Sequence, residues 1–227
     1  TTRQCTFVTF TPLQTRATAY SSIASPTTVS TLRPTNTAIS TTRKMSSTTT
    51  EDFIQRKKVL RKEIRSRVKK LTQEQISTQS KSVWNHLFTL PEYQNASSVG
   101  LFCSMPKGEI ETDVACTQVL KDGKILYVPR VGLDFEKCDM DLVKVVPKEK
   151  EEEEQLFHHD WPRNKWGIPE PPTDVEHETA GPGDIDLLVV PGLAFDVYGG
   201  RLGQGKGYYD RFIAKINPRT DDDKKTL

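Results

Sequence analysis

A short apolar segment, residues 186–191 (DLLVVP), is the clearest candidate for a buried strand, and a glycine-rich loop follows it directly. Five glycines fall between Gly199 and Gly207, Arg201 and Lys206 lie among them, and a helix is expected over residues 207–216. Glycines leave backbone N–H groups accessible, and a helix N-terminus adds partial positive charge, so the loop is suited to hold phosphate groups. The alternative is a purely structural turn, which the interleaved cations argue against.

The spacing of residues 200–206 fits the G-x4-G-K half of a P-loop. The next residue is Gly207, where a P-loop needs the Ser or Thr that ligates magnesium. A P-loop also usually follows the first strand of its domain, whereas this loop follows the last strand that the pattern indicates. We therefore expect nucleotide phosphate binding without a P-loop NTPase fold.

Residues 1–50 differ in composition from the rest of the chain. They hold 24 Ser or Thr and five positive charges but no Asp or Glu, and they cannot bury enough apolar surface to offset their ordering entropy. We expect a disordered extension, which is either a mitochondrial or plastid transit peptide or upstream sequence ahead of a true start at Met45. Removing its charges leaves 27 positive and 30 negative for residues 51–227, a net of −3.

Residues 51–227 read as one domain in which helical and strand patterns alternate. A basic helix over residues 53–71 precedes a second helix opened by a Thr72/Gln75 capping box and ended at Pro91. Two strands are predicted over 98–105 and 125–131, and a helix over 112–121 lies between them. Residues 141–146 suggest a further strand, and the acidic run at 148–155 is expected to be a loop. Strand–helix–strand units build parallel sheets, so we predict an α/β fold of three layers, with a mostly parallel, Rossmann-like sheet and helices on both faces.

Several classes of function are excluded by composition. The longest apolar segment, residues 187–195, is about half of the roughly 18 residues that a membrane span needs. The four cysteines lack CxxC or metal-ligand spacing, which indicates reduced thiols inside a cell. The basic helix alone would suit RNA binding, but the net negative charge of residues 51–227 argues against nucleic acid as a partner.

Five motifs together resemble the 5-formyltetrahydrofolate cyclo-ligase family, also called 5,10-methenyltetrahydrofolate synthetases. They are K-K-V-L-R at 57–61, E-I-E-T at 109–112, W-G-I-P-E-P at 166–171, P-G-L-A-F-D at 191–196 and G-R-L-G-Q-G-K-G-Y-Y-D at 200–210. The resemblance runs from about Phe53 to Leu227. It implies that ATP phosphorylates the formyl oxygen of 5-formyltetrahydrofolate, that N10 then attacks the activated carbon, and that ADP, phosphate and the 5,10-methenyl product form.

The resemblance also implies roles for individual residues. Lys206, Arg201 and Tyr208 would be catalytic, and Asp210 would bind Mg²⁺. The residues implied to bind ATP are Lys57, Lys58, Val59, Leu60, Arg61, Arg201, Leu202, Gly203, Gln204, Gly205, Lys206, Gly207, Tyr208 and Tyr209. The residues implied to bind the folate are Cys103, Glu109, Trp166, Gln204, Gly205, Lys206, Gly207 and Tyr208.

Family members continue beyond the KKTL end of this chain with further strands and a second acidic metal ligand, so we expect a C-terminally truncated domain. The alternative function is accordingly a non-catalytic homologue that binds folate or nucleotide. The expected partner is a small molecule, 5-formyltetrahydrofolate with or without a polyglutamate tail, and we expect a monomer. The expected compartment is the cytoplasm or the mitochondrion, with the cytoplasm favoured if Met45 starts the protein.

Overall fold

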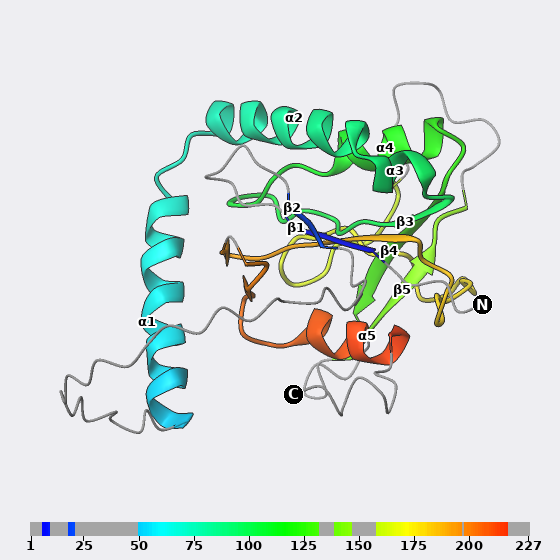
Figure 1. Cartoon of the computed structure of the whole chain (residues 1–227). Helices are drawn as coiled ribbons and strands as arrows, with labels where there is room; N and C mark the ends of the chain where they lie inside the picture. Colours follow the sequence, from blue (N-terminus) through cyan, green and yellow to red (C-terminus); the bar gives the residue numbers. More distant parts are fainter. Residues whose placement is uncertain are drawn as a thin grey trace, which may run out of the picture.

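A six-stranded mixed sheet forms the centre of the protein (Figure 1). In this computed structural model, residues 6–9, 18–20, 50–131, 139–146, 158–196 and 198–217 are described. The strands are β1 (Thr6–Thr9), β2 (Thr18–Tyr20), β3 (Ser98–Gly100), β4 (Ile125–Val131), β5 (Met140–Lys144) and β6 (Leu187–Val190), in the spatial order β2-β1-β6-β3-β4-β5. The four central strands are mutually parallel, while β2 and β5 lie antiparallel at the two edges. This confirms the predicted α/β class.

Side chains of alternate residues on the strands face two separate hydrophobic clusters. On β6, Leu187 and Val189 belong to one cluster, and Leu188 and Val190 belong to the other. Helices α2 (Gln73–Thr89), α3 (Pro91–Asn95) and α4 (Asp113–Lys121) cover the first face, and α5 (Tyr208–Ile216) covers the second (Figure 1). Strands buried on both faces require cover on both faces, and this gives the predicted three layers.

Local sequence signals account for several boundaries. Helix α2 starts with the capping box, since the Thr72 hydroxyl accepts the Gln75 N–H and the Gln75 side chain accepts the Thr72 N–H. Pro91 does not simply end this helix; it begins the short helix α3 as a first-turn proline, a position where the missing N–H costs nothing. Strand β4 has the predicted bounds, whereas β3 ends at Gly100, well before residue 105.

Two parts of the structure differ from the sequence expectations. The first fifty residues were expected to stay outside the fold, but β1 and β2 pair on the sheet beside β6. The glycine-rich segment was expected to be a continuous loop, but β7 (Ala194–Phe195) and β8 (Arg201–Leu202) form a small antiparallel ribbon within it. The acidic run at 148–155 lies outside the described residues.

Helix α1 (Thr50–Val68) stands beside the three layers and contributes only its last residue, Val68, to the buried interior (Figure 1). Its side chains are otherwise exposed or half-buried. None of the described helices combines the length and apolar character needed to cross a bilayer.

Candidate functional site

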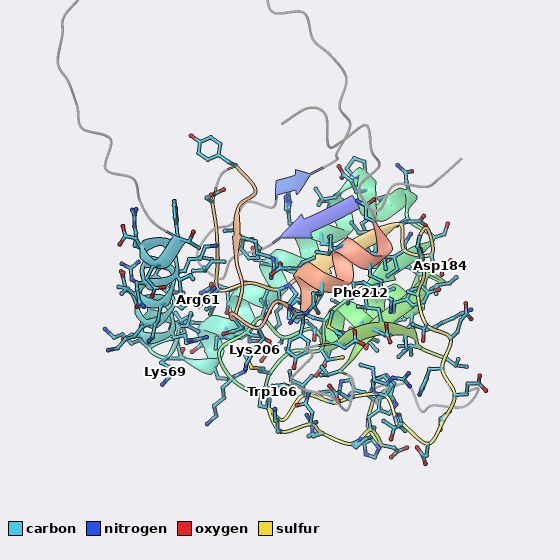
Figure 2. The ribbon with its side chains drawn as sticks, turned by 90° about the horizontal axis from the view of Figure 1, so that it is seen from below. Arg61, Lys69, Trp166, Asp184, Lys206 and Phe212 are labelled. Carbon is cyan, nitrogen blue, oxygen red and sulfur yellow. The ribbon has the colours of Figure 1, made fainter. Side chains whose placement is uncertain are left out.

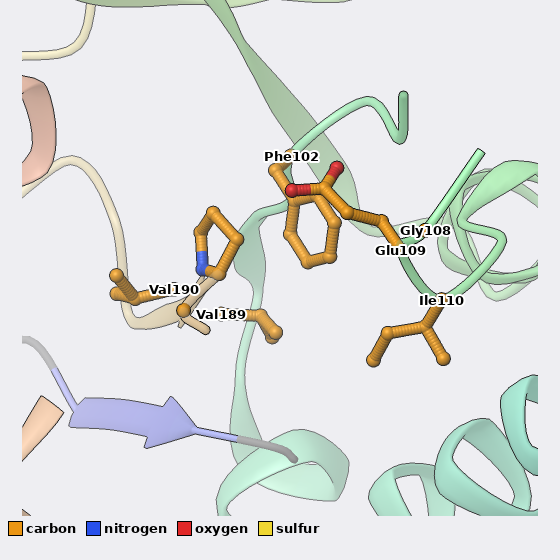
Figure 3. A pocket seen from close by; sticks show the side chains of 8 residues that line it. Phe102, Gly108, Glu109, Ile110, Val189 and Val190 are labelled. Carbon is orange, nitrogen blue, oxygen red and sulfur yellow. The ribbon is translucent and has the colours of Figure 1, made fainter. Parts of the chain in front are cut away.

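The carboxyl ends of the parallel strands β3 and β6 open at the same edge of the sheet, and a pocket lies there (Figure 3). The segment after β3 supplies one wall, and the end of β6 with the following residues supplies the other. The lining residues are Phe102, Gly108, Glu109, Ile110, Val189, Val190, Pro191 and Gly192. In open α/β sheets ligands bind at this edge, so the pocket is where the fold favours a substrate site.

Glu109 provides the carboxylate of this pocket. Figure 3 shows its side chain pointing toward the side of the pocket that Phe102 lines. Its Oε2 accepts a hydrogen bond from the Met105 N–H at 3.0 Å. Burial raises the pKa of Glu109, and the bond from Met105 opposes that rise only in part. A partly desolvated carboxylate beside an aromatic ring is suited to accept hydrogen bonds from a flat heterocycle that carries N–H donors.

The glycine-rich loop leads from β8 into α5 and adopts a backbone that only glycine takes easily. Gly205 has φ +108° and Gly207 has φ +75°, and Gly207 is the residue that precedes the first turn of α5. The side chain of Lys206 between them is exposed, and its ammonium has no hydrogen-bond or ion-pair partner among the described residues. A cation without a partner in the described part of the chain thus lies beside a helix N-terminus, an arrangement suited to a phosphate group.

Helix α1 contacts this loop through two arginines, and Figure 2 shows Arg61 on the same side of the molecule as Lys206. Arg61 Nε donates to the Gly203 carbonyl at 3.0 Å. Arg65 donates to the Gln204 backbone carbonyl at 3.1 Å and to its side-chain Oε1 at 2.9 Å. The structure therefore brings together the two segments that the resemblance assigns to ATP, the motif at 57–61 in the middle of α1 and the glycine-rich loop.

Not every residue of the helical motif faces that loop. Lys57 lies one turn before Arg61 and shares its face, whereas Val59 is two positions away, on the opposite face, and is 66% exposed. Lys58 and Leu60 are also exposed. The structure thus supports a shared position for Lys57 and Arg61, and it does not bring the Val59 side chain to the site.

Arg201 and Asp210 form an ion pair across the base of the loop. The second terminal nitrogen of Arg201, Nη1, donates to the Pro191 carbonyl at 3.0 Å, so the arginine ties the end of β6 to the first turn of α5. Its side chain is 15% exposed and that of Asp210 is 72% exposed. Arg201 is therefore a structural tie in this state, while Asp210 still presents oxygen to solvent. Within the described part of the chain, no group of three or more metal-ligating side chains gathers.

Trp166 and Tyr208, both assigned to the folate side by the sequence, meet in the structure. Their rings contact edge to face, with centroids 6.4 Å apart and an interplanar angle of 81°. Trp166 is 37% exposed, and Lys165 places its ammonium 4.6 Å from the indole centroid. A half-exposed aromatic ring fixed at one edge offers its remaining surface to a ligand.

Two assigned residues lie deeper than expected. Cys103 is buried in the core, where burial raises the pKa of its thiol to about 12, so its side chain is not presented to a ligand. Tyr209 packs against both hydrophobic clusters, and burial raises the pKa of its hydroxyl well above the usual value. Leu202 lies in β8 and pairs with Ala194.

Sequence reasoning missed the pocket wall formed by residues 189–192 and the loop contact of Arg65. The apolar run before the glycines predicts a strand. In parallel sheets ligands bind at the carboxyl ends of the strands, and this general rule could have indicated that the residues at the end of this strand line a pocket. Arg65 lies four residues after Arg61, a spacing that places both on one helix face and could have indicated it.

Comparison with known proteins identifies the same family that the motifs resemble. A model of the 5-formyltetrahydrofolate cyclo-ligase family matches residues 53–227. The 5-formyltetrahydrofolate cyclo-ligase of Mus musculus is 36% identical over 160 residues, which cover 70% of this chain and 74% of the mouse protein. A probable 5-formyltetrahydrofolate cyclo-ligase of Schizosaccharomyces pombe is 35% identical over 160 residues, covering 70% and 72%.

A solved structure is similar as well. The NMR structure of the Aquifex aeolicus 5,10-methenyltetrahydrofolate synthetase aligns with a TM-score of 0.55 at 33% sequence identity. The alignment covers 71% of this chain and 73% of the Aquifex protein.

Proposed function

This chain belongs to the 5-formyltetrahydrofolate cyclo-ligase family, and we propose that it catalyses the ATP-dependent cyclisation of 5-formyltetrahydrofolate to 5,10-methenyltetrahydrofolate at the edge where β3 and β6 end. One observation supports the proposal: residues that the motifs assign to ATP and residues that they assign to the folate lie at the same end of the glycine-rich loop. Lys206 precedes Tyr208 by two positions in the sequence, and the Tyr208 ring contacts Trp166.

One half of the proposed site would bind the phosphates of ATP, and the other half would bind the pterin ring of the folate. Arg61 already contacts the glycine-rich loop, and Lys57 lies one turn away on the same face, so α1 and the loop would enclose the phosphates of ATP between them. Glu109 and Phe102 would hold the pterin ring through its N–H donors and its flat face, and the exposed surface of Trp166 would cover it.

The formyl oxygen of 5-formyltetrahydrofolate is a poor leaving group, and phosphorylation converts it into a good one. The formyl oxygen on N5 takes the γ-phosphoryl group of ATP, and ADP is released. The lone pair of N10 then attacks the formyl carbon, the carbon–oxygen bond breaks with loss of phosphate, N10 gives up its proton, and the methenyl bridge remains. Lys206 would neutralise charge on the transferring phosphoryl group, and alignment of the two substrates would supply much of the acceleration.

Asp210 is suited to contribute one carboxylate ligand to Mg²⁺, because its side chain is largely exposed beside the proposed phosphate site although one of its oxygens, Oδ1, pairs with Arg201. The ion would shield phosphate charge there. A single protein carboxylate suffices in such sites, because Mg²⁺ usually keeps several waters and takes substrate phosphates as further ligands. The expected monomeric state and the expected compartment, cytoplasm or mitochondrion, stay predictions.

The direct test incubates the purified chain with 5-formyltetrahydrofolate, ATP and Mg²⁺ and follows the absorbance of the methenyl product. Phosphate release should match product formation one to one and should require both substrates. Saturable binding of folate and ATP without product or phosphate would instead support the non-catalytic homologue.

A further inference from the structure

The turn that carries Trp166 is held by hydrogen bonds of two side chains: Arg163 Nη1 donates to the Gly167 carbonyl at 2.9 Å, and Asn164 makes three bonds. Asn164 Oδ1 accepts hydrogen bonds from the N–H groups of Trp166 at 2.9 Å and Ile168 at 3.1 Å. Its Nδ2 donates to Glu170 Oε1 at 2.9 Å. The backbone closes the same turn, since the Asn164 N–H donates to the Ile168 carbonyl at 2.9 Å and the Gly167 N–H donates to the Asn164 carbonyl at 2.8 Å.

This turn contacts both halves of the site. On one side the Trp166 ring meets Tyr208 at the start of α5, as described above. On the other side Gly167 lies so close to Pro106 that a Cβ on it would stand 2.9 Å from Pro106 Cγ, and Gly167 has φ +78°. Pro106 directly follows Met105, whose N–H holds the carboxylate of Glu109. The shape of the turn therefore fixes where the indole stands relative to Glu109 and Tyr208.

Asn164 does not line the pocket, so its effect on a ligand would pass through the turn. An asparagine is needed for the full set of bonds, because it accepts two N–H groups with one atom and donates to a carboxylate with the other. An aspartate would keep the acceptors but would place a second carboxylate against Glu170.

We propose that Asn164, oriented by Glu170, is a positioning residue that sets the turn at 164–168 and thereby holds the Trp166 ring at the folate side of the site. This inference rests on the proposed function, in which Trp166 covers the folate. It assigns to Asn164 and Glu170 a role in folate affinity that does not extend to ATP.

The test exchanges the direction of the hydrogen bond between the two side chains. Asn164→Asp leaves two facing carboxylates, and the apparent KM for 5-formyltetrahydrofolate should rise about tenfold with the KM for ATP unchanged. Glu170→Gln keeps an acceptor for Asn164, and its folate KM should stay within about twofold of the wild type. In the double variant the Gln amide donates to the Asp carboxylate, and the folate KM should return to within about threefold.

Asn85→Asp serves as the matched control, because Asn85 is exposed on α2 and the substitution introduces the same charge. A second readout does not depend on activity. The emission of Trp166, isolated by subtracting the spectrum of the same background with Trp166→Phe, should shift to the red and become more accessible to iodide in Asn164→Asp. It should recover in the double variant.

The outcomes separate the two proposals. If the wild type forms no methenyl product, the proposed function fails, and the Trp166 emission still decides whether Asn164 positions the ring. If the wild type is active, the positioning role is overturned by an unchanged folate KM in Asn164→Asp, by equal rises in the folate and ATP KM values, or by a double variant that does not recover. A loss of thermal stability without the selective KM change would show a merely structural role.

Discussion

Replacing Gly205 by alanine tests whether α1 and the glycine-rich loop form one nucleotide site. Gly205 has φ +108°, a conformation that costs an L-residue about 1–3 kcal/mol. The new Cβ would also stand 3.4 Å from Arg61 Cζ and 3.5 Å from Arg61 Nε, in van der Waals contact with the guanidinium. When the backbone at residue 205 relaxes its strain, this methyl group shifts against the guanidinium and disturbs the hydrogen bond from Arg61 to the Gly203 carbonyl, which is 3.0 Å long.

Gly183→Ala is the matched control. Gly183 has φ +88°, and a Cβ there would meet nothing within 4 Å, so the control carries the backbone strain without the contact. Both variants should lose about 1–3 kcal/mol of stability, which for a domain of this size lowers Tm by roughly 2–12 °C. Only Gly205→Ala should weaken nucleotide binding. Loss of one charge-assisted contact to a phosphate costs about 1.5–3 kcal/mol, or about 10- to 100-fold in affinity.

The assay titrates a non-hydrolysable ATP analogue by calorimetry and measures Tm by scanning fluorimetry on the same samples. The reasoning is refuted if Gly205→Ala binds the analogue as tightly as Gly183→Ala does while both show the loss of stability. It is also refuted if Gly205→Ala weakens folate binding and leaves nucleotide binding intact, because the loop would then serve the other half of the site.

Four further outcomes follow from the structure. Lys206→Ala should lower kcat/KM by about two to three powers of ten while Tm stays within about 2 °C, because its ammonium stabilises no described partner but would meet the phosphoryl group. Burial raises the pKa of Glu109, so folate affinity in binding titrations should fall as pH drops toward that raised pKa and the accepting carboxylate becomes protonated. Glu109→Gln should bind more weakly and lose this dependence. Arg201→Ala should lower stability in denaturant titrations by about 1–3 kcal/mol, whereas Asp210→Asn should mainly raise the Mg²⁺ concentration needed for half-maximal rate. Gly100→Ala should cost about 1–3 kcal/mol in the same titrations, because its Cβ would stand 2.6 Å and 2.9 Å from the methyl groups of two core leucines.

The fold class could be predicted because its signals are local. The capping box at Thr72, the apolar strand β6 and the strand β4 depend on neighbouring residues and on hydrophobic periodicity, and the structure has them where the pattern indicates. The direction of β5 could not be predicted in this way. An antiparallel edge strand and a parallel one carry similar apolar patterns, and only pairing with β4 fixes the direction.

The sequence alone determined which residue types the site could draw on: the glycines and cations of the loop, the carboxylate of Glu109 and the indole of Trp166. Only the tertiary structure decided how they meet. In the folded chain Cys103 is buried in the core, Arg201 pairs with Asp210, and Trp166, whose N–H bonds to Asn164, contacts Tyr208. Those outcomes depend on contacts between residues far apart in the chain, and such contacts arise from packing the whole sheet and its helices together, which no local pattern encodes.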